Sequence, residues 1–172
     1  MAQLLMLRPS LDDLPDLPPL PEGYLLRRGS PADAESMGTM MTLAYQEPFG
    51  AEWCNKTLLE HPDVYATFLV SHRGDVVGTA SCLELADRPH VGYVHYVGGH
   101  PEHAGKRLGY IATLATLHEF KRVGKTEAIL NTDDHRLPAI RVYLQLGFVP
   151  QYPEEDHPAR WMRIFQVLLG SR

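Results

Sequence analysis

The sequence predicts a mixed α/β domain in which one central sheet is flanked by helices. Two hydrophobic periods alternate along the chain, a period of two that is typical of strands and a period near 3.6 that is typical of helices. Their order is strand, two helices, three strands, helix, strand, helix, strand and helix. With 172 residues and 44% hydrophobic composition, the chain can form one substantial core. We therefore expect a mixed twisted sheet of about six to seven strands, antiparallel early and parallel around the later crossover helix.

The N-terminal segment has a composition that opposes regular structure. Five prolines and three aspartates lie within residues 9–21. Because proline fixes φ and lacks a backbone N–H donor, this segment is expected to be extended. We predict an N-terminal arm over residues 1–22 that lies on the surface of a single domain formed by residues 23–172.

The first half of the domain alternates strand and helix patterns. The elements expected here are a strand over 24–28, a helix over 31–45, a short helix over 52–60 and two strands over 64–71 and 75–85. Ser30 and Pro31 favour the start of the first helix as N-cap and first helical residue. Arg73 and Gly74 lie between the two last strands, which is typical of a hairpin turn.

The second half contains the later strands and three helices. The elements expected here are a strand over 92–98, a helix over 107–123, a strand over 127–132, a helix over 137–146, a strand over 148–151 and a closing helix from 158. Gly124 and Gly147 follow two of the helices, where glycine commonly ends a helix. The closing helix is indicated by an apolar stripe of Trp161, Ile164, Phe165, Leu168 and Leu169.

Charge and cysteine content narrow the class of function. A net charge of -5 gives no general attraction to phosphate polymers, so nucleic acid is not an expected partner. No segment approaches the roughly 20 apolar residues of a membrane span or resembles a signal peptide, which indicates a cytoplasmic protein without a membrane partner. Cys54 and Cys82 lack metal or redox spacing, and His100 and His103 lack an identifiable third partner. Reduced core cysteines and no metal are expected.

The turn at residues 97–110 is the most informative feature for function. It joins a strand pattern to a helix pattern, and Gly105 and Gly109 fall at the junction. The first N–H groups of a helix have no partner within it, and with the positive end of the helix dipole they form an anion site. Glycine lets a ligand approach the backbone closely, although glycines at such junctions can also serve only a steric purpose. The turn therefore points to a phosphate-bearing ligand.

Two sequence runs carry a resemblance to a known family. They are Tyr-Val-Gly-Gly-His-Pro-Glu-His-Ala-Gly-Lys-Arg-Leu-Gly and Pro-Ala-Ile-Arg-Val-Tyr-Leu-Gln-Leu-Gly-Phe. With the order of elements, they resemble the GNAT superfamily of acetyl-CoA-dependent N-acetyltransferases over residues 23–151. The resemblance implies splayed fourth and fifth strands, with the pantetheine arm of acetyl-CoA in the gap and its pyrophosphate on the loop that opens the third helix. The cofactor-binding residues that it implies are Val97, Gly98, Gly99, Gly105, Lys106, Arg107, Leu108, Gly109 and Tyr110.

Some positions depart from the family's pattern. Ala104 stands where the family usually has Arg or Gln, and Arg107 stands where it usually has glycine. Lys106 and Arg107 can bring positive charge to a phosphate, or they can be solvated cations at a helix start. Arg136 stands where Asn is common, a residue that hydrogen-bonds to the cofactor, so Arg136 is a further cofactor-binding candidate.

The resemblance also suggests catalytic residues. Tyr143 aligns with the family's helix tyrosine, which can protonate the departing thiolate; a core tyrosine beside Leu146 and Phe148 is the alternative. His95 is the first candidate for the general base, because the arylalkylamine N-acetyltransferase branch has a histidine there and imidazole titrates near neutral pH. A structural histidine is its alternative. Glu84 is the carboxylate candidate, with an exposed surface role as its alternative.

The activity implied by the resemblance is transfer of an acetyl group from acetyl-CoA to a primary amine, directly within a ternary complex. The acceptor stays open between a small molecule, a peptide N-terminus and a protein lysine. Asp133 and Asp134 either bind a cationic substrate or cap the next helix, and we favour the cap. A noncatalytic acyl-CoA-binding module and a nucleotide-binding regulatory domain are the rival classes. The closing helix can pack on its own sheet or on a second copy in a homodimer.

Overall fold

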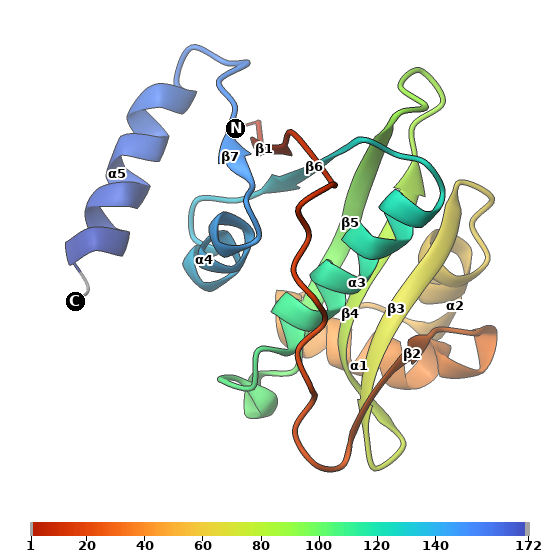
Figure 1. The fold of residues 1–172 in the computed structure, drawn as a ribbon. Coiled ribbons are helices and arrows are strands. Elements are labelled where there is room, and N and C mark those ends of the chain that lie inside the picture. Colours follow the sequence, from red (N-terminus) through yellow and green to blue (C-terminus); the bar gives the residue numbers. More distant parts are fainter. Residues whose placement is uncertain (1, 171–172) are drawn as a thin grey trace.

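A computed structural model describes residues 2–170 as a seven-stranded mixed sheet with helices on both faces (Figure 1). The strands are β1 (Leu4–Arg8), β2 (Tyr24–Arg28), β3 (Val64–His72), β4 (Asp75–Glu84), β5 (Val91–Gly99), β6 (Glu127–Thr132) and β7 (Val149–Pro150). The helices are α1 (Ala34–Tyr45), α2 (Ala51–Cys54), α3 (Leu108–Arg122), α4 (Leu137–Gln145) and α5 (His157–Gly170). Three short helical segments complete the described elements: the 3₁₀ helices η1 (Pro31–Asp33) and η3 (Pro101–His103) and the π-helix η2 (Asn55–Leu59).

The strand order confirms the predicted mixed sheet. It is β2-β3-β4-β5-β6-β1-β7. Neighbouring strands are antiparallel except β5 and β6, which are parallel and are connected by the crossover helix α3. A parallel pair needs such a long connection, whereas the β3–β4 hairpin needs only Arg73 and Gly74, both at positive φ.

Helices bury both faces of the sheet. α1 and α2 cover one face with a core of methionines and small apolar residues from Met37 to Leu58. α3 covers the other face, and the core beneath it continues under α4 and α5, where Tyr143 and Trp161 are buried (Figure 1). The predicted closing helix is confirmed as α5. Cys54 and Cys82 are free and buried, as expected.

One strand was not predicted. Residues 4–8, which we assigned to the N-terminal arm, form β1 and insert between β6 and β7, with antiparallel pairing to both. Leu4 and Met6 are fully buried there. The expected boundary at residue 23 is therefore wrong, because the compact fold already includes β1.

The proline-rich segment after β1 is extended, as expected. Residues 9–21 contain no helix or strand and run across α3 (Figure 1). The carbonyls of Asp12 and Pro15 accept hydrogen bonds from the side chains of Lys121 and His118 on that helix. The segment thus lies along the surface and connects β1, which lies between β6 and β7, to the edge strand β2 on the opposite side of the sheet.

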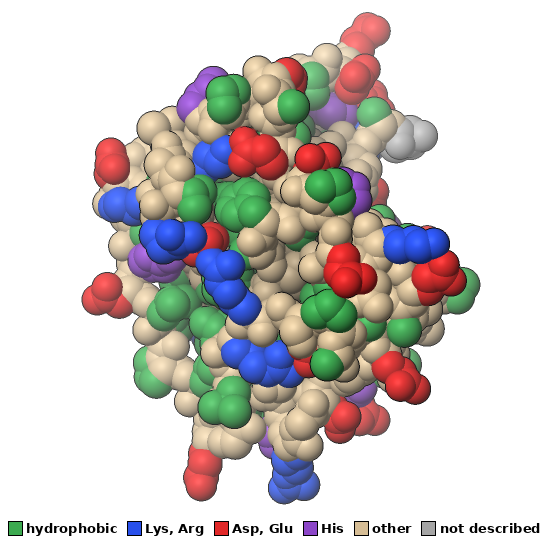
Figure 2. Space-filling model, turned by 90° about the vertical axis from the view of Figure 1, so that its right-hand side faces the viewer, with side chains coloured by type: hydrophobic (Ala, Val, Ile, Leu, Met, Phe, Trp, Pro, Cys, Tyr) green, Lys and Arg blue, Asp and Glu red, His purple; other side chains and the backbone are tan. Residues whose placement is uncertain are grey.

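Surface charge is mixed. Figure 2 shows basic and acidic side chains interspersed over the face that it presents, in keeping with the modest net charge of -5. Among the described residues, none of the helices combines the length and the apolar character needed to cross a membrane.

Replacing Leu4 in β1 tests whether this strand is part of the core. Leu4→Ala should lower the free energy of unfolding by about 2–5 kcal/mol, because it removes fully buried apolar volume. Leu25→Ala on the edge strand β2, where the side chain is 66% exposed, is the matched control and should change it by less than about 0.5 kcal/mol. Urea unfolding followed by circular dichroism measures both. Equal small effects would show that β1 contributes little.

Candidate active site

The site begins where β5 and β6 part. Only Val91–Tyr93 of β5 pair with β6, at Glu127–Ile129. Beyond Tyr93, β5 continues to Gly99 with β4 on its other side, and β6 continues to Thr132 with β1 on its other side. The predicted splay of the fourth and fifth strands of the sequence pattern is therefore present, and it leaves the edge of β5 facing a gap.

A β-bulge changes the direction of β5 beside this gap. Thr79 of β4 pairs with Gly98, but Ser81 pairs with His95, so β5 has one extra residue in this interval. Tyr96 absorbs the irregularity with φ of 45°, a conformation that costs a non-glycine residue energy. Such a bulge interrupts the alternation of faces, so His95 and Val97 are not related by simple alternation along the strand. Both residues nevertheless line the same pocket.

Two side chains fill the gap beside the bulge. The Tyr45 hydroxyl donates to the Val97 carbonyl at 2.7 Å, and Arg136 donates to the same carbonyl at 2.9 Å. The Arg136 guanidinium also lies over the Tyr45 ring, 4.4 Å from its centroid. Tyr45 was missed by the sequence analysis, because the end of α1 meets β5 only through the tertiary fold. Arg136 contacts the strand that was expected to hold the cofactor.

A small pocket of about 160 Å³ lies at this point. Its lining comes from β5 and β6, the end of α1, α4, the residue before β1 and the loop between β6 and α4: Gln3, Tyr45, Tyr93, Val94, His95, Tyr96, Val97, Asn131, Asp133, Arg136 and Tyr143. Burial raises the pKa of Tyr143, whereas the charge of Arg136 acts in the opposite direction. Tyr143 is thus a protonated hydroxyl donor at neutral pH. The structure brings together Tyr143, His95, Val97 and Arg136, which were four of the predicted site residues.

His95 lies between aromatic rings. Its ring centroid is 4.5 Å from that of Tyr96 and 5.6 Å from that of Tyr93. Burial, and to a smaller extent the charge on His61, lowers the pKa of His95 to about 4. The imidazole is therefore neutral at pH 7, where it can accept a proton only as a weak base.

Glu84 lies elsewhere. Its carboxylate is bound by the buried Lys125 at 2.5 Å, and it lines a separate pocket with Glu119 and Arg122. In the sheet it pairs with Gly92, at the end of β5 opposite the bulge. The structure does not bring Glu84 to the Tyr143 pocket, so Glu84 is not placed to act as a base there.

The aspartates after β6 do not cap α4. Asp134 binds Arg160 of α5 at 2.5 Å, and Asp133 accepts from the side chain of Gln3. The N-cap residue of α4 is Arg136, and among the described residues no side-chain cap is found there. The favoured capping interpretation is therefore wrong, and Asp133 instead lines the pocket.

The loop after β5 and the first turn of α3 have the backbone geometry of an anion site; we call residues 105–110 the anion loop. Gly105 has φ of 79° and Arg107, the N-cap of α3, has φ of 59°. Within the described chain, no carbonyl accepts a hydrogen bond from the backbone N–H groups of residues 105–110. Left-handed backbone at Arg107 explains why glycine is usual there, since only glycine adopts it without strain. The side chains of Leu108 and Tyr110 are buried, so these residues present only their backbone.

The glycines of this region fall into two groups. A Cβ on Gly98 would lie 3.1 Å from Met41 Sδ and 3.4 Å from Tyr45, so this glycine is required for α1 to pack on β5. A Cβ on Gly99, Gly105 or Gly109 would meet no atom within 4 Å. The positive φ of Gly105 already requires glycine, but packing within the described chain explains neither Gly99 nor Gly109, whereas a ligand held against the loop would. The Arg107 guanidinium lies 4.2 Å over the Tyr110 ring, beside the same N–H groups.

One chain thus combines the splayed strands, the bulge and the anion loop. The chain belongs to the acetyltransferase (GNAT) family, whose model matches residues 34–148. Mycothiol acetyltransferases of Thermobispora bispora and Actinosynnema mirum are 33% and 29% identical to it over 155 and 162 residues. These matches cover 83% and 86% of this chain and 52% of each relative. The chain thus spans about half the length of the curated relatives it matches.

Solved structures share the fold. A GCN5-related N-acetyltransferase from Sphaerobacter thermophilus superposes with a TM-score of 0.68 at 22% identity, over 88% of this chain and 50% of that one. One from Kribbella flavida gives 0.62 at 25% identity, over 87% and 55%. The ribosomal-protein-S18-alanine N-acetyltransferase from Escherichia coli gives 0.64 at 15% identity, over 78% and 86%.

The protonation of His95 is directly measurable. Because burial disfavours its charged form, NMR titration of its ring should give a midpoint near pH 4, with the signal assigned by its loss in His95→Gln. The unfolded chain takes up this proton near pH 6.5 and the folded chain near pH 4. The wild type should therefore lose stability relative to His95→Gln as pH falls from about 6.5 to about 4. A midpoint near 6.5 would show that the ring is hydrated.

Proposed function

We propose that this chain is an N-acetyltransferase that moves an acetyl group from acetyl-CoA to a primary amine within a ternary complex. The observation that carries the proposal is the continuity of two features on β5. The unpaired edge of β5 lies beside Tyr143, and the same strand leads to the unpaired N–H groups of residues 105–110. An extended ligand with a pyrophosphate can pair with the strand edge and place its phosphates at the helix N-terminus.

The residues present fit acetyl-CoA. Gly99, Gly105 and Gly109 leave open space against the backbone, and Lys106 and Arg107 bring positive charge beside the phosphate-binding N–H groups. Bound there, acetyl-CoA would supply a thioester, whose acyl carbonyl carbon is already activated for attack by an amine. Arg136 and Tyr45 occupy the Val97 carbonyl in the structure, so pairing of a ligand with that carbonyl requires at least one of them to move.

The chain's own groups divide the proton transfers between them. Tyr143, kept protonated by burial, donates to the thiolate that leaves when the tetrahedral intermediate collapses. Backbone N–H groups along the free edge of β5 stabilise negative charge on the carbonyl oxygen. His95, or a water beside it, takes the proton of the attacking amine. With a pKa of about 4, His95 is a weak base but a stronger one than water, so a water beside it would act as a relay that passes the proton on.

The names of the similar proteins suggest which acceptor amine to test first. The similar proteins of Thermobispora bispora and Actinosynnema mirum are named mycothiol acetyltransferases. An amine related to that of mycothiol is therefore the first acceptor to test, ahead of peptide N-termini and protein lysines. A broad amine panel, with release of free CoA thiol as the signal, covers all three classes.

Removal of the Tyr143 hydroxyl tests the acid. With an amine that supports thiol release in the wild type, Tyr143→Phe should lower kcat by about 100-fold, since a positioned acid contributes on this scale. The Kd for acetyl-CoA should stay within about twofold, because the aromatic ring still packs beside Phe148. Tyr152→Phe, at a 55% exposed tyrosine, is the matched control and should retain full activity. Acetyl-CoA binding without amine-dependent thiol release in the wild type would instead favour the noncatalytic module.

A methyl group on Gly109 tests the phosphate loop. Gly109→Ala should leave thermal stability equal or slightly higher, because its Cβ meets no protein atom and alanine favours helix by about 1 kcal/mol. The Kd for acetyl-CoA should rise about tenfold or more, because the methyl group occupies the space needed for the phosphates. Gly50→Ala, another glycine with open space around it, is the control for both measurements. Unchanged acetyl-CoA affinity in Gly109→Ala would place the phosphates elsewhere.

A further inference from the structure

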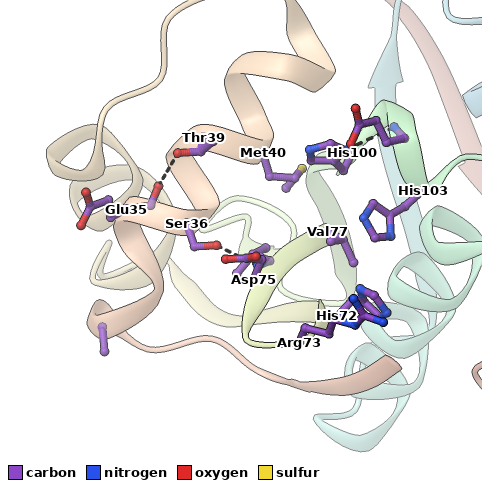
Figure 3. A pocket seen from close by; sticks show the side chains of 13 residues that line it. Glu35, Ser36, Thr39, Met40, His72, Arg73, Asp75, Val77, His100 and His103 are labelled. Atoms are coloured by element: carbon purple, nitrogen blue, oxygen red, sulfur yellow. Dashed lines mark hydrogen bonds between the residues drawn. The ribbon is translucent and has the colours of Figure 1, made fainter. Parts of the chain in front are cut away.

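A second, larger hollow lies next to the anion loop and has no role in the proposed transfer. This histidine groove has a volume of about 710 Å³ and lies between the N-terminal half of α1, the β3–β4 hairpin and η3 (Figure 3). Its lining includes three histidines that the sequence analysis left without a function, His72, His100 and His103. Figure 3 shows these rings gathered on one side of the groove, with Glu35 on the far side.

The three imidazoles are held in defined orientations. The ring centroids of His72 and His100 are each 5.2 Å from that of His103. Tyr24 stacks on His72 at 4.4 Å, and its hydroxyl lies 2.7 Å from Nδ1 of His103. Nδ1 of His100 accepts the backbone N–H of Glu102 at 3.2 Å.

These contacts determine which ring nitrogens are free to bind a ligand. Because Nδ1 of His100 is an acceptor, its neutral ring carries the proton on Nε2. The same holds for His103 when the Tyr24 hydroxyl donates to its Nδ1. The two histidines then present Nε2–H donors even without a net charge. Such N–H donors suit an acceptor-rich ligand rather than a cation.

Groups of both charge signs surround the three imidazoles. Burial, then repulsion from His100, His72 and Lys106, lowers the pKa of His103, and only Glu102 opposes this effect. The other charged groups that line the groove are Arg73 and Asp75 on the hairpin and Glu35 on α1. A bound anion would relieve the repulsion within the cluster and favour its protonation.

The histidine cluster also lies close in sequence to the anion loop. His103 precedes Gly105 by two residues, so at most about 7 Å of backbone separates it from the first of the N–H groups of the anion loop. In acetyl-CoA, a ribose ring separates the pyrophosphate from the 3′-phosphate. That phosphate monoester is a dianion with acceptor oxygens only, which matches a set of N–H donors.

We propose that His72, His100 and His103 form a subsite for a phosphate monoester, the 3′-phosphate of acetyl-CoA. The inference rests on the proposed function, because it takes acetyl-CoA as the ligand of the neighbouring loop. It assigns the histidine groove to recognition of the adenosine end of the ligand, whereas the Tyr143 pocket handles the acyl end.

The test compares acetyl-CoA with 3′-dephospho-acetyl-CoA by isothermal titration calorimetry. Wild-type protein should bind acetyl-CoA about tenfold more tightly, since hydrogen bonds to a charged group are worth this much. The double variant His100→Asn/His103→Asn, which removes the two Nε2–H donors, should bind both compounds equally, with the affinity that the wild type has for the dephospho compound. His90→Asn, outside the groove at the other end of β5, is the matched control and should keep the discrimination.

A milder variant guards against loss of the fold. Tyr24→Phe keeps the ring stacked on His72 but removes the hydroxyl beside His103, and it should reduce the discrimination without changing affinity for the dephospho compound. Equal affinity of the wild type for both compounds, retained discrimination in the double variant, or an equal loss for both compounds would overturn the subsite. Failure of the wild type to bind either compound would overturn the proposed function, and the subsite with it.

Discussion

The function proposed for this molecule depends on where the pairing between β5 and β6 stops. Three residues of each strand are joined, and then each strand keeps its partner on the outer side only. Backbone groups released from a sheet need other partners, because unpaired buried N–H and C=O groups are costly. Tyr45 and Arg136 supply them at Val97, from the ends of two different helices. The gap is therefore lined by side chains that can move, and no strand seals it.

One strand serves both ends of the proposed ligand. The bulge at Tyr96 sets the position of the Tyr143 pocket, and the end of β5 at Gly99 leads through η3 to the anion loop. Left-handed backbone at Gly105 and Arg107 turns the chain so that α3 begins with free N–H groups. The distance between the acyl site and the phosphate site is thus fixed by a short stretch of backbone, and the histidine groove lies just beyond it.

Most of the fold could be predicted from sequence, because strands after residue 23 and the long helices show clear hydrophobic periods. β1 could not, since a short apolar run before a proline-rich segment resembles a tail and its partner β6 is more than a hundred residues away. In the site, Tyr143 and His95 were expected from the family resemblance; both line one pocket, and their catalytic roles stay predictions. The contact of Tyr45 with Val97 and the bulge at Tyr96 could not be predicted, because they arise from packing between elements that are distant in sequence. Glu84 was expected near the site because of its position on a strand, but that position does not reveal its ion pair with Lys125.

The central claim is that one ligand lies along the free edge of β5 and ends on the loop before α3. Backbone amide NMR of the full chain during titration with acetyl-CoA measures this most directly. The account predicts that the largest shift changes fall on residues 94–99 and 105–110, with Tyr45 and Arg136 also affected as their contact with Val97 is altered. Saturable shifts confined to other parts of the sheet, with these two segments unchanged, would contradict it.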